Sequence, residues 1–491
     1  MNMNFPSLPR VRHLSPLALA LVLTGCTLAP KYERPTAPIE ATYPASPIAT
    51  EAAKSAAVIA AEVGWRDFFS DPLLQQLIEI SLENNRDFRT AALNVEAAQA
   101  LYRIQRAKLM PELGVAAHGV SERLPAELNS GGTSQLNRRY DVGGISTAWE
   151  LDLWGRIRSL NEQALATYLA LDETRLAAQT SLIAELANTY LTLLADQELL
   201  RLSSDTLATQ QRSYELSRQL KELGHATQLD LHRAEVALRQ AESSYATYSR
   251  QAALDRNALV LLLGQPLSAE LSRQLDEAAT LPDQILVADL PGGLPSDLLV
   301  RRPDIRAAEQ TLRGANANIG AARAAFFPTI SLTGSLGTAS ASLDGLFDSG
   351  TRAWSFLPSI NLPIFKGGAL LANLEVAHVR KRIEITQYEK TIQVAFREVA
   401  DGLASRSLLD QQIQSEKLAV TANLEAQTLA TQRFQEGIDD YLSVLDAHRS
   451  LYSSQQTLVR TRLTRLSNLI DLYKALGGGW KEHTNSPDQS T

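Results

Sequence analysis

The sequence predicts a mainly helical fold with a small membrane β part, built twice along one chain. Three observations predict this fold class. Long stretches repeat apolar residues at heptad spacing, two short inserts alternate apolar and polar residues as strands do, and segments of the first half align with segments of the second. The chain therefore carries two copies of one plan: a helix, a pair of strands and two very long helices.

The chain begins with the features of an exported protein. Arg10 and Arg12 precede an apolar run and then small residues, the layout of a secretory signal peptide, and the run is too short to span a bilayer. The only cysteine, Cys26, follows in the segment LTGC. A buried free cysteine is the alternative, but this segment resembles the lipobox of bacterial lipoproteins.

The lipobox resemblance implies that the chain is cleaved before Cys26, which then carries a thioether-linked diacylglycerol and an N-acyl chain. Several acyl chains make a durable anchor where one is marginal. Thr27 stands where Asp usually signals retention at the inner membrane. The implied location is therefore the inner leaflet of a Gram-negative outer membrane, and no other cofactor is expected.

Composition narrows the class of protein further. The net charge of −7 argues against nucleic-acid binding, which needs a basic face. With Cys26 acylated, no thiol remains for disulfides or metal clusters, so packing alone must stabilise the fold. No second apolar run approaches the roughly 20 residues of a transmembrane helix. A chain of this kind can cross a membrane only as strands of a closed β-barrel.

The two halves align over most of their length. Asn84–Leu113 aligns without gaps with Arg301–Ile330, and both segments end near a shared proline, Pro111 and Pro328. Further on, WELDLWGR (149–156) parallels INLPIFKG (360–367), and LGHATQLDLHRAEVAL (223–238) parallels EGIDDYLSVLDAHRSL (436–451). The chain is thus predicted to be a tandem duplication that divides near residues 282–295.

The inserts have the alternation of membrane strands. In the second insert Ile330, Leu332 and Leu336 alternate with Thr and Ser, and the first is predicted to place one apolar set on a single face: Ile145, Thr147, Trp149, Leu151 and Leu153. Each strand is about 10 residues long, as a tilted membrane strand requires. Soluble hairpins are the alternative. Because four strands cannot close a barrel around a channel, we expect three copies to supply twelve strands.

The long helices carry a coiled-coil seam. Residues 156 to about 223 contain neither proline nor glycine, and a helix of roughly 65 residues is about 100 Å long, far beyond a globular core. An ordinary amphipathic bundle is the alternative. Heptad spacing is kept in the first half by Leu186, Leu193, Leu200, Leu207 and Tyr214, and in the second by Leu445, Tyr452, Val459, Leu466 and Tyr473.

These patterns divide the chain into five parts. The predicted parts are a signal peptide at 1–25, a lipidated, proline-rich tether at 26–64, a first repeat at 65–281, a second repeat at 282–481 and a polar tail at 482–491. The first repeat has its strand pair at about 111–153 and long helices at about 156–264. The second has a helix at about 301–326, a strand pair at about 328–363 and long helices at about 367–476.

Fragments spread over the whole mature chain resemble one family, the outer membrane factor channels of tripartite RND-type multidrug efflux systems, in its lipoprotein branch. The fragments are LTGC…APKYERP, GWRDFFSDPLLQQLIE, ELDLWGR, RRPDIRAAE, FFPTISLTGS, GIDDYLSVLDAHRSLYSSQQ and LYKALGGGW. The resemblance implies a homotrimer with one twelve-stranded β-barrel in outer-membrane lipid and a trimeric α-barrel tunnel through the periplasm. It also implies two partners, a periplasmic adaptor (membrane fusion) protein and an inner-membrane RND-type transporter, and passive conduction of small molecules to the exterior.

Two helix-to-helix turns are the candidate functional region. Gly224 and Gly437 suit the left-handed C′ position that ends a helix, and Thr227 and either Asp439 or Asp440 can cap the helix that follows. The resemblance places the closed end of the tunnel at these turns.

The same resemblance assigns a gate to this region. Leu442 and Asp446, one helical turn apart, match the family's constricting ring residues. Arg449 lies three residues beyond Asp446, so a surface ion pair is the alternative, and Arg233, which aligns with Asp446, is a second candidate partner. The full candidate gate set is Leu442, Asp446, Arg449, Arg233, Leu229, Asp439 and Asp440.

Three rival functions are weaker. An enzyme is disfavoured because the chain lacks HExxH, GxSxG and GxxxxGK[ST], and its seven histidines are scattered, so no metal site is expected. A non-conducting coiled-coil structural lipoprotein has no need of amphipathic strands. A channel for type I protein secretion is the third, and the lipobox and the LYKALGGGW ending favour efflux over it. The sequence does not identify the cargo.

Overall fold

The computed structural model describes residues 27–40, 43, 60–128, 133–278, 280–282 and 295–484. The predicted signal peptide and Cys26 lie outside these residues, as do most of the predicted division at 282–295 and the tail beyond Thr484. None of the helices in these ranges is long and apolar enough to cross a membrane.

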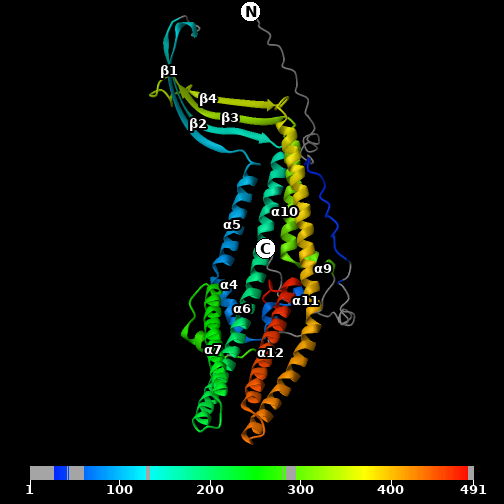
Figure 1. Cartoon of the computed structure of the whole chain (residues 1–491). Helices are drawn as coiled ribbons and strands as arrows, with labels where there is room; N and C mark the ends of the chain where they lie inside the picture. The colour runs from blue at the N-terminus through cyan, green and yellow to red at the C-terminus, as the bar shows by residue number, and fades with distance from the viewer. Residues whose placement is uncertain are drawn as a thin grey trace, which may run out of the picture. The chain divides into compact units, whose positions relative to one another are not determined.

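The elements follow the predicted order (Figure 1). The first half contains α3 (Trp65–Phe68), α4 (Pro72–Asn84), α5 (Arg86–Ala107), β1 (Leu113–Leu124), β2 (Gln135–Leu151), α6 (Arg156–Glu222), α7 (Gln228–Leu263) and α8 (Ala269–Glu277). The second contains α9 (Pro295–Arg301), α10 (Pro303–Ala324), β3 (Thr329–Ser340), β4 (Arg352–Asn361), α11 (Ala369–Gln435) and α12 (Tyr441–Ala475). The 3-10 turns η1 (Ala60–Glu62) and η2 (Ala126–Leu128) complete the set in the described ranges.

Two pairs of helices related by the repeat have equal lengths, and one contact between helices recurs in both halves. Helices α6 and α11 both have 67 residues, and α5 and α10 both have 22. The Asn85 side chain donates to the Leu262 carbonyl (3.0 Å) near the end of α7. Its aligned counterpart Arg302 donates to the Ala475 carbonyl (2.9 Å) at the end of α12. The residue that precedes α5 and the one that precedes α10 therefore bind the ends of α7 and α12 in the same way, but with different side chains.

The chain forms two compact units, and both halves contribute to each. The strand unit consists of residues up to Pro35, Val95–Ala170 and Ala308–Tyr388. The helical unit consists of Thr36–Asn94, Leu171–Ala307 and Glu389–Thr491.

The helical unit has a continuous apolar core. Half of the predicted seam lies in it: Leu186, Leu193, Val459, Leu466 and Tyr473 are buried. The seam residues nearer the helix-to-helix turns are only half-buried: Leu200, Leu207, Tyr214, Leu445 and Tyr452. The ring of Tyr473 stacks on Phe68 with 3.9 Å between centroids. Burial of this kind is the main source of stability in a chain without disulfides.

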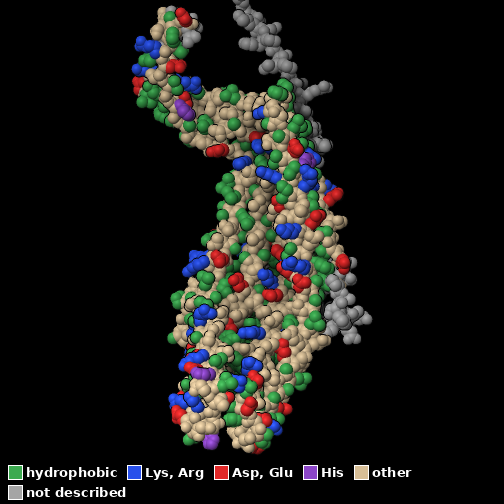
Figure 2. Space-filling view, viewed as in Figure 1, with side chains coloured by type: hydrophobic (Ala, Val, Ile, Leu, Met, Phe, Trp, Pro, Cys, Tyr) green, Lys and Arg blue, Asp and Glu red, His purple; other side chains and the backbone are tan. Residues whose placement is uncertain are grey.

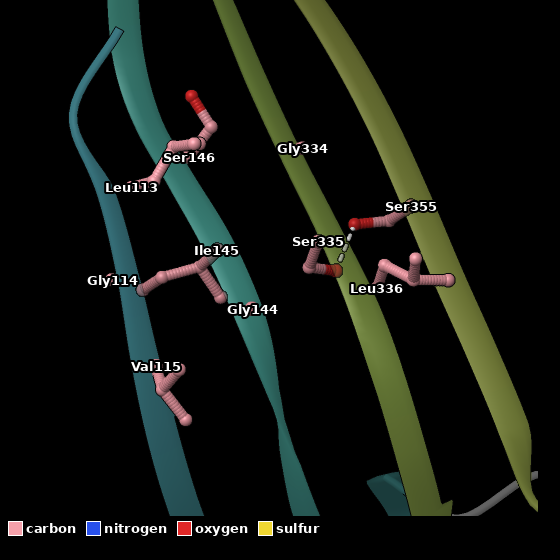
Figure 3. A pocket seen from close by; sticks show the side chains of 10 residues that line it. All are labelled: Leu113, Gly114, Val115, Gly144, Ile145, Ser146, Gly334, Ser335, Leu336 and Ser355. Atoms are coloured by element: carbon pink, nitrogen blue, oxygen red, sulfur yellow. Dashed lines mark hydrogen bonds between the residues drawn. The ribbon is translucent and has the colours of Figure 1, made fainter.

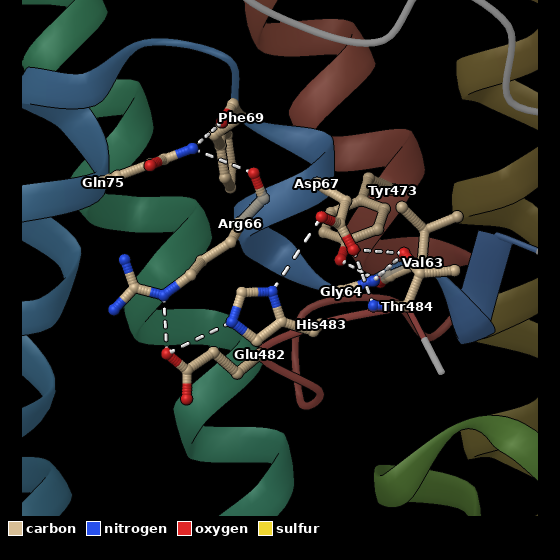
Figure 4. Close-up of polar contacts among 10 residues, drawn as sticks. All are labelled: Val63, Gly64, Arg66, Asp67, Phe69, Gln75, Tyr473, Glu482, His483 and Thr484. Atoms are coloured by element: carbon tan, nitrogen blue, oxygen red, sulfur yellow. Dashed lines mark hydrogen bonds and ion pairs between the residues drawn. The ribbon is translucent and has the colours of Figure 1, made fainter. Parts of the chain in front are cut away.

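Residues after α12 are bound to α3, the first α-helix of the helical unit (Figure 4). Arg66 pairs with Glu79 (2.7 Å) and with Glu482 (2.5 Å), and the Thr484 backbone N–H donates to Asp67 (2.6 Å). The first residues of the predicted polar tail thus pack on α3.

One buried cation holds three helices of this unit. Arg302 is 6% exposed and pairs with Asp304 (2.6 Å) and Glu398 (2.8 Å) while it donates to the Ala475 carbonyl. A buried charge is tolerated only with such partners. The RRPDIRAAE fragment therefore fixes the start of α10 against α11 and the end of α12.

In the strand unit, the first part of the predicted tether, residues 27–34, forms a strap along α10. These residues have no secondary structure of their own. Arg34 pairs with Glu309 (2.7 Å), the Tyr32 hydroxyl donates to Glu309 (3.2 Å), and Asn316 donates to the Pro30 carbonyl (2.8 Å). Although burial opposes it, hydrogen bonds from Arg34 and Arg313 lower the pKa of Glu309, so the carboxylate is charged and receives the strap.

Candidate functional site

The strands form one antiparallel sheet in the order β1-β2-β3-β4, with β1 and β4 at its edges. Side chains on facing residues share a face, and faces alternate along each strand. The apolar face follows from the pairings of Ile330 with Leu151 and Ile360, and of Leu332 with Trp149 and Pro358. The predicted alternation of Ile330, Leu332 and Leu336 is thereby confirmed.

The opposite face of the sheet is polar. Ser331 faces Ser359 and Ser335 faces Ser355, and in each pair the two hydroxyl oxygens lie 2.7 Å apart. Serine hydroxyls that bond each other across strands satisfy both groups on a face otherwise open to solvent. The sheet thus has one surface suited to lipid and one suited to water.

The predicted single face for Ile145 through Leu153 is wrong. The register of β2 against β3 shifts between Ser146 and Trp149, which places one extra residue in β2. Ile145 consequently lies opposite Ser335 on the polar face, whereas Trp149 lies on the apolar face. A bulge reverses the alternation, and no residue type in this stretch signals it.

Two facing glycines set how closely β2 and β3 approach. A Cβ atom on Gly143 would lie 2.6 Å from the Gly337 Cα, and one on Gly337 would lie 2.5 Å from the Gly143 Cα. Beside them the sheet forms a hollow of about 570 Å³, in which the Ser335–Ser355 hydrogen bond is visible (Figure 3). Charged side chains gather at the far end of the β1–β2 hairpin, while most of the remaining visible surface of the sheet is hydrophobic or uncharged (Figure 2).

The base of the sheet is held by aromatic and charged side chains. Trp154, just after β2, stacks on Phe327, just before β3, with ring centroids 4.7 Å apart, and its indole N–H donates to the Pro328 carbonyl (2.9 Å). Arg156 forms a two-pronged pair with Glu150 (2.5 and 2.8 Å). The ELDLWGR fragment therefore joins the strand to the long helix.

The first helix-to-helix turn lies between α6 and α7 in the helical unit. Gly224 has φ +78°, as predicted for a left-handed C′ residue. Thr227 caps α7 through a capping box with Asp230, and its hydrogen bonds lower the pKa of the Asp230 carboxyl.

The second turn, between α11 and α12, has the same design. Gly437 has φ +74°, and Asp440, not Asp439, caps α12 by accepting from the Ser443 N–H (3.2 Å). Asp439 instead pairs with Arg433 (2.6 Å), which lowers the pKa of its carboxyl. Of the two capping candidates, the structure selects Asp440.

The candidate gate residues lie just beyond these turns. Leu442 and Leu229 are exposed, at 37% and 58%. Asp446 pairs with Arg449 (3.0 Å), and Arg233 lies nearest to Asp230 (3.9 Å) on its own helix. Within one copy of the chain, Asp446 therefore pairs with Arg449, whereas Arg233 pairs with Asp230, the acid of the α7 capping box.

One pair of carboxyl groups was not predicted from sequence. Asp255 on α7 is 8% exposed and accepts from Gln251 (3.2 Å). Burial, and then the neighbouring Asp255 carboxyl, raise the pKa of Asp196 on α6 to about 7, against an opposing effect of Arg460. The two acids are 59 positions apart in sequence and meet only because α7 folds back along α6, which no local pattern reveals.

Comparison with known proteins agrees with this architecture. The profile of the family described as "Outer membrane efflux protein" matches residues 77–265 and 294–478, one match in each repeat. The chain is 48% identical over 476 residues to the antibiotic efflux pump outer membrane protein ArpC of Pseudomonas putida, covering 97% of both chains. It has the same identity and coverage with the toluene efflux pump outer membrane protein TtgC of that species.

A solved structure of an outer-membrane channel has the same fold as this chain. The open-state structure of the MtrE outer membrane channel of Neisseria gonorrhoeae superposes with a TM-score of 0.84 at 41% identity, covering 94% of this chain and all of MtrE. The duplicated long helices and four-stranded sheet define an outer-membrane channel protein. The chain belongs to the outer membrane efflux protein family, whose members are non-enzymatic transport proteins.

Proposed function

We propose that this protein is the exit duct of a tripartite efflux pump, which passively conducts small molecules across the outer membrane. The observation that carries the proposal is the sheet with one apolar face, one polar face and two unpaired edges. Three copies joined at these edges would form a closed twelve-stranded barrel with the apolar face toward lipid. The long helices would continue it as a tunnel in the periplasm.

The proposed partners follow from the function. A passive duct needs an energised transporter, so we propose an inner-membrane RND-type transporter and a periplasmic adaptor protein below the tunnel. Relatives named for antibiotic and toluene efflux support drugs and apolar solvents as cargo. The proposed anchor is the acylated Cys26 in the outer membrane, after cleavage of residues 1–25.

The proposed gate lies at the α11–α12 turn. With threefold symmetry, Leu442 would form an apolar ring and Asp446 an acidic ring about 6 Å further along the helix, four residues at a rise of about 1.5 Å. An apolar constriction can close by dewetting, and an acidic ring repels anions. Leu229, Arg233, Asp439 and Asp440 would support the gate as parts of the two turns.

The test is reconstitution of the purified protein. We expect a trimer by native mass spectrometry in mild detergent and discrete conductance steps in planar bilayers. A monomer without conductance would overturn the duct in favour of a structural lipoprotein. A strain that lacks the gene and overproduces the cognate transporter should accumulate more dye, whereas unchanged dye with loss of an exported protein from the medium would identify a secretion channel.

A further inference from the structure

A contact at the base of the sheet occurs in only one of the two places where the duplication would put it. Trp154 follows β2 and packs on Phe327 and the Pro328 carbonyl, which precede β3. In the aligned repeats, Phe365 corresponds to Trp154, and Met110 and Pro111 correspond to Phe327 and Pro328.

These counterparts do not meet in one copy of the chain. Phe365 is 88% exposed just after β4, and Met110 is 72% exposed just before β1. Strands β1 and β4 are opposite edges of the sheet, with β2 and β3 between them. The repeat-related contact is therefore incomplete and lacks the half that only a second copy can supply.

The strand edges show the same incompleteness. The β2–β3 junction pairs Trp149 with Leu332. The aligned counterparts are Ile360 on β4 and Val115 on β1, which are 71% and 82% exposed. Large apolar side chains on an unpaired strand edge are a liability that a partner strand removes.

The register of the missing junction can be derived. Ile360 lies on the apolar face because it pairs with Ile330, and β1 places Val115 on that same face, across from Gly144 and Leu336. A shift of one residue would put one of the two side chains on the polar face. Only registers that differ by an even number of residues preserve the faces, and the duplication selects one of them.

We propose that β4 of one copy pairs with β1 of the next with Ile360 opposite Val115, and that Phe365 packs on Met110 and Pro111 of that next copy. The interface thus reproduces between copies the junction that β2 and β3 make within one. Because Phe365 has no indole N–H, it cannot form the hydrogen bond that Trp154 forms. It contributes apolar contacts only, among them a contact between its aromatic ring and the Met110 sulfur. This inference rests on the proposed trimer and adds its register and its contact residues.

Disulfide trapping tests the register. Directly opposed residues of antiparallel strands have Cα atoms about 4.5–5.5 Å apart, within the range that a disulfide bridges. Cysteines introduced by Ile360→Cys and Val115→Cys in one chain should give a ladder of cross-linked dimer and trimer on non-reducing gels. The matched control pairs Ile360→Cys with Ala117→Cys, two residues along the same face, and should cross-link about fivefold less.

The outcomes separate this inference from the proposed function. A trimer by native mass that cross-links better through the control pair, or through neither pair, overturns the register and leaves the channel intact. A monomeric parent protein overturns the proposed function itself. Phe365→Ala should lower the temperature at which the trimer dissociates while the single chain keeps its helical circular dichroism, and Phe365→Leu should restore part of the loss. An unchanged dissociation temperature in Phe365→Ala would overturn the packing contact.

Discussion

Asp446 has two possible roles, and its surroundings separate them. Its ion pair with Arg449 joins side chains that are 56% and 77% exposed, so the pair adds at most about 0.5 kcal/mol to stability. A residue with so small a structural role can be changed without loss of the fold. Any large effect of its substitution must then come from a role in conduction.

The gate is tested by combining Leu442→Ala with Asp446→Ala. We expect a larger single-channel conductance and greater sensitivity of cells to large antibiotics, with normal trimer yield, because the apolar and acidic rings would both be removed. Arg138→Ala, near the far end of the β1–β2 hairpin, serves as the control and should leave conductance unchanged. If the double variant had the conductance of the parent protein, the gate role would be contradicted, and the role of Asp446 would be that of a surface ion pair only.

The acid pair of α6 and α7 predicts a pH-dependent stability. The pKa of Asp196 is raised to about 7 when folded, whereas an unfolded Asp has a pKa of about 3.9. Between these values the folded state holds a proton that the unfolded state has lost, so stability falls as pH rises from about 4 to 7 and then levels off. Because Asp196 is only partly buried, solvent screens part of this effect.

Asp196→Asn should remove this dependence. We expect its free energy of unfolding in detergent to match the parent near pH 4 and to exceed it by about 1 kcal/mol at pH 7.5, a shift of about 1 °C in unfolding temperature for a chain of this length. Asp205→Asn on the exposed side of the same helix is the control, with no such trend. A parent–variant difference that is constant from pH 4 to 7.5 would contradict the shared-proton explanation.

At the scale of elements, the spacing of apolar residues and the positions of helix-ending glycines predicted most of the architecture. The helix ends at Gly224 and Gly437 were predictable because a left-handed C′ residue favours glycine. The bulge at Ser146 was not, because one extra residue in a strand depends on its partner's register. The strap was predicted only as an extended tether. Its docking was not predictable, because Arg34 and its partner Glu309 are 275 positions apart in sequence.

The close approach of β2 and β3 gives a sharp test at this scale. Gly337→Ala would place a Cβ atom 2.5 Å from the Gly143 Cα, too close for any relaxation short of moving a strand. We expect loss of folded trimer from the outer membrane, measured by heat-modifiable migration on gels. Gly334→Ala, whose nearest contact would be 3.7 Å, should assemble normally and controls for the lost glycine. Equal yields of the two variants would contradict the role of the Gly143–Gly337 contact.

At the scale of the whole molecule, two attachments to the membrane are proposed, the strands and the lipid. The strap connects them within the strand unit. Thr27 packs against Gly155, where an added Cβ would lie 2.9 Å from the Thr27 Cα. The first described residue after the proposed lipidation site therefore packs between the end of β2 and the start of α6.

Cys26→Ser separates the two attachments. The variant should incorporate no labelled palmitate, because the serine hydroxyl is not a thiol nucleophile for the thioether bond, and persistent label would refute acylation at this residue. Two or more acyl chains anchor a protein durably, yet in the proposed barrel the sheet would also bury an apolar face of its own in lipid. We therefore expect the variant to keep trimers and conductance in bilayers while drug resistance in cells falls only in part. Loss of the trimer together with the label would instead mean that the lipid is needed to bring the strands into the membrane before they can close.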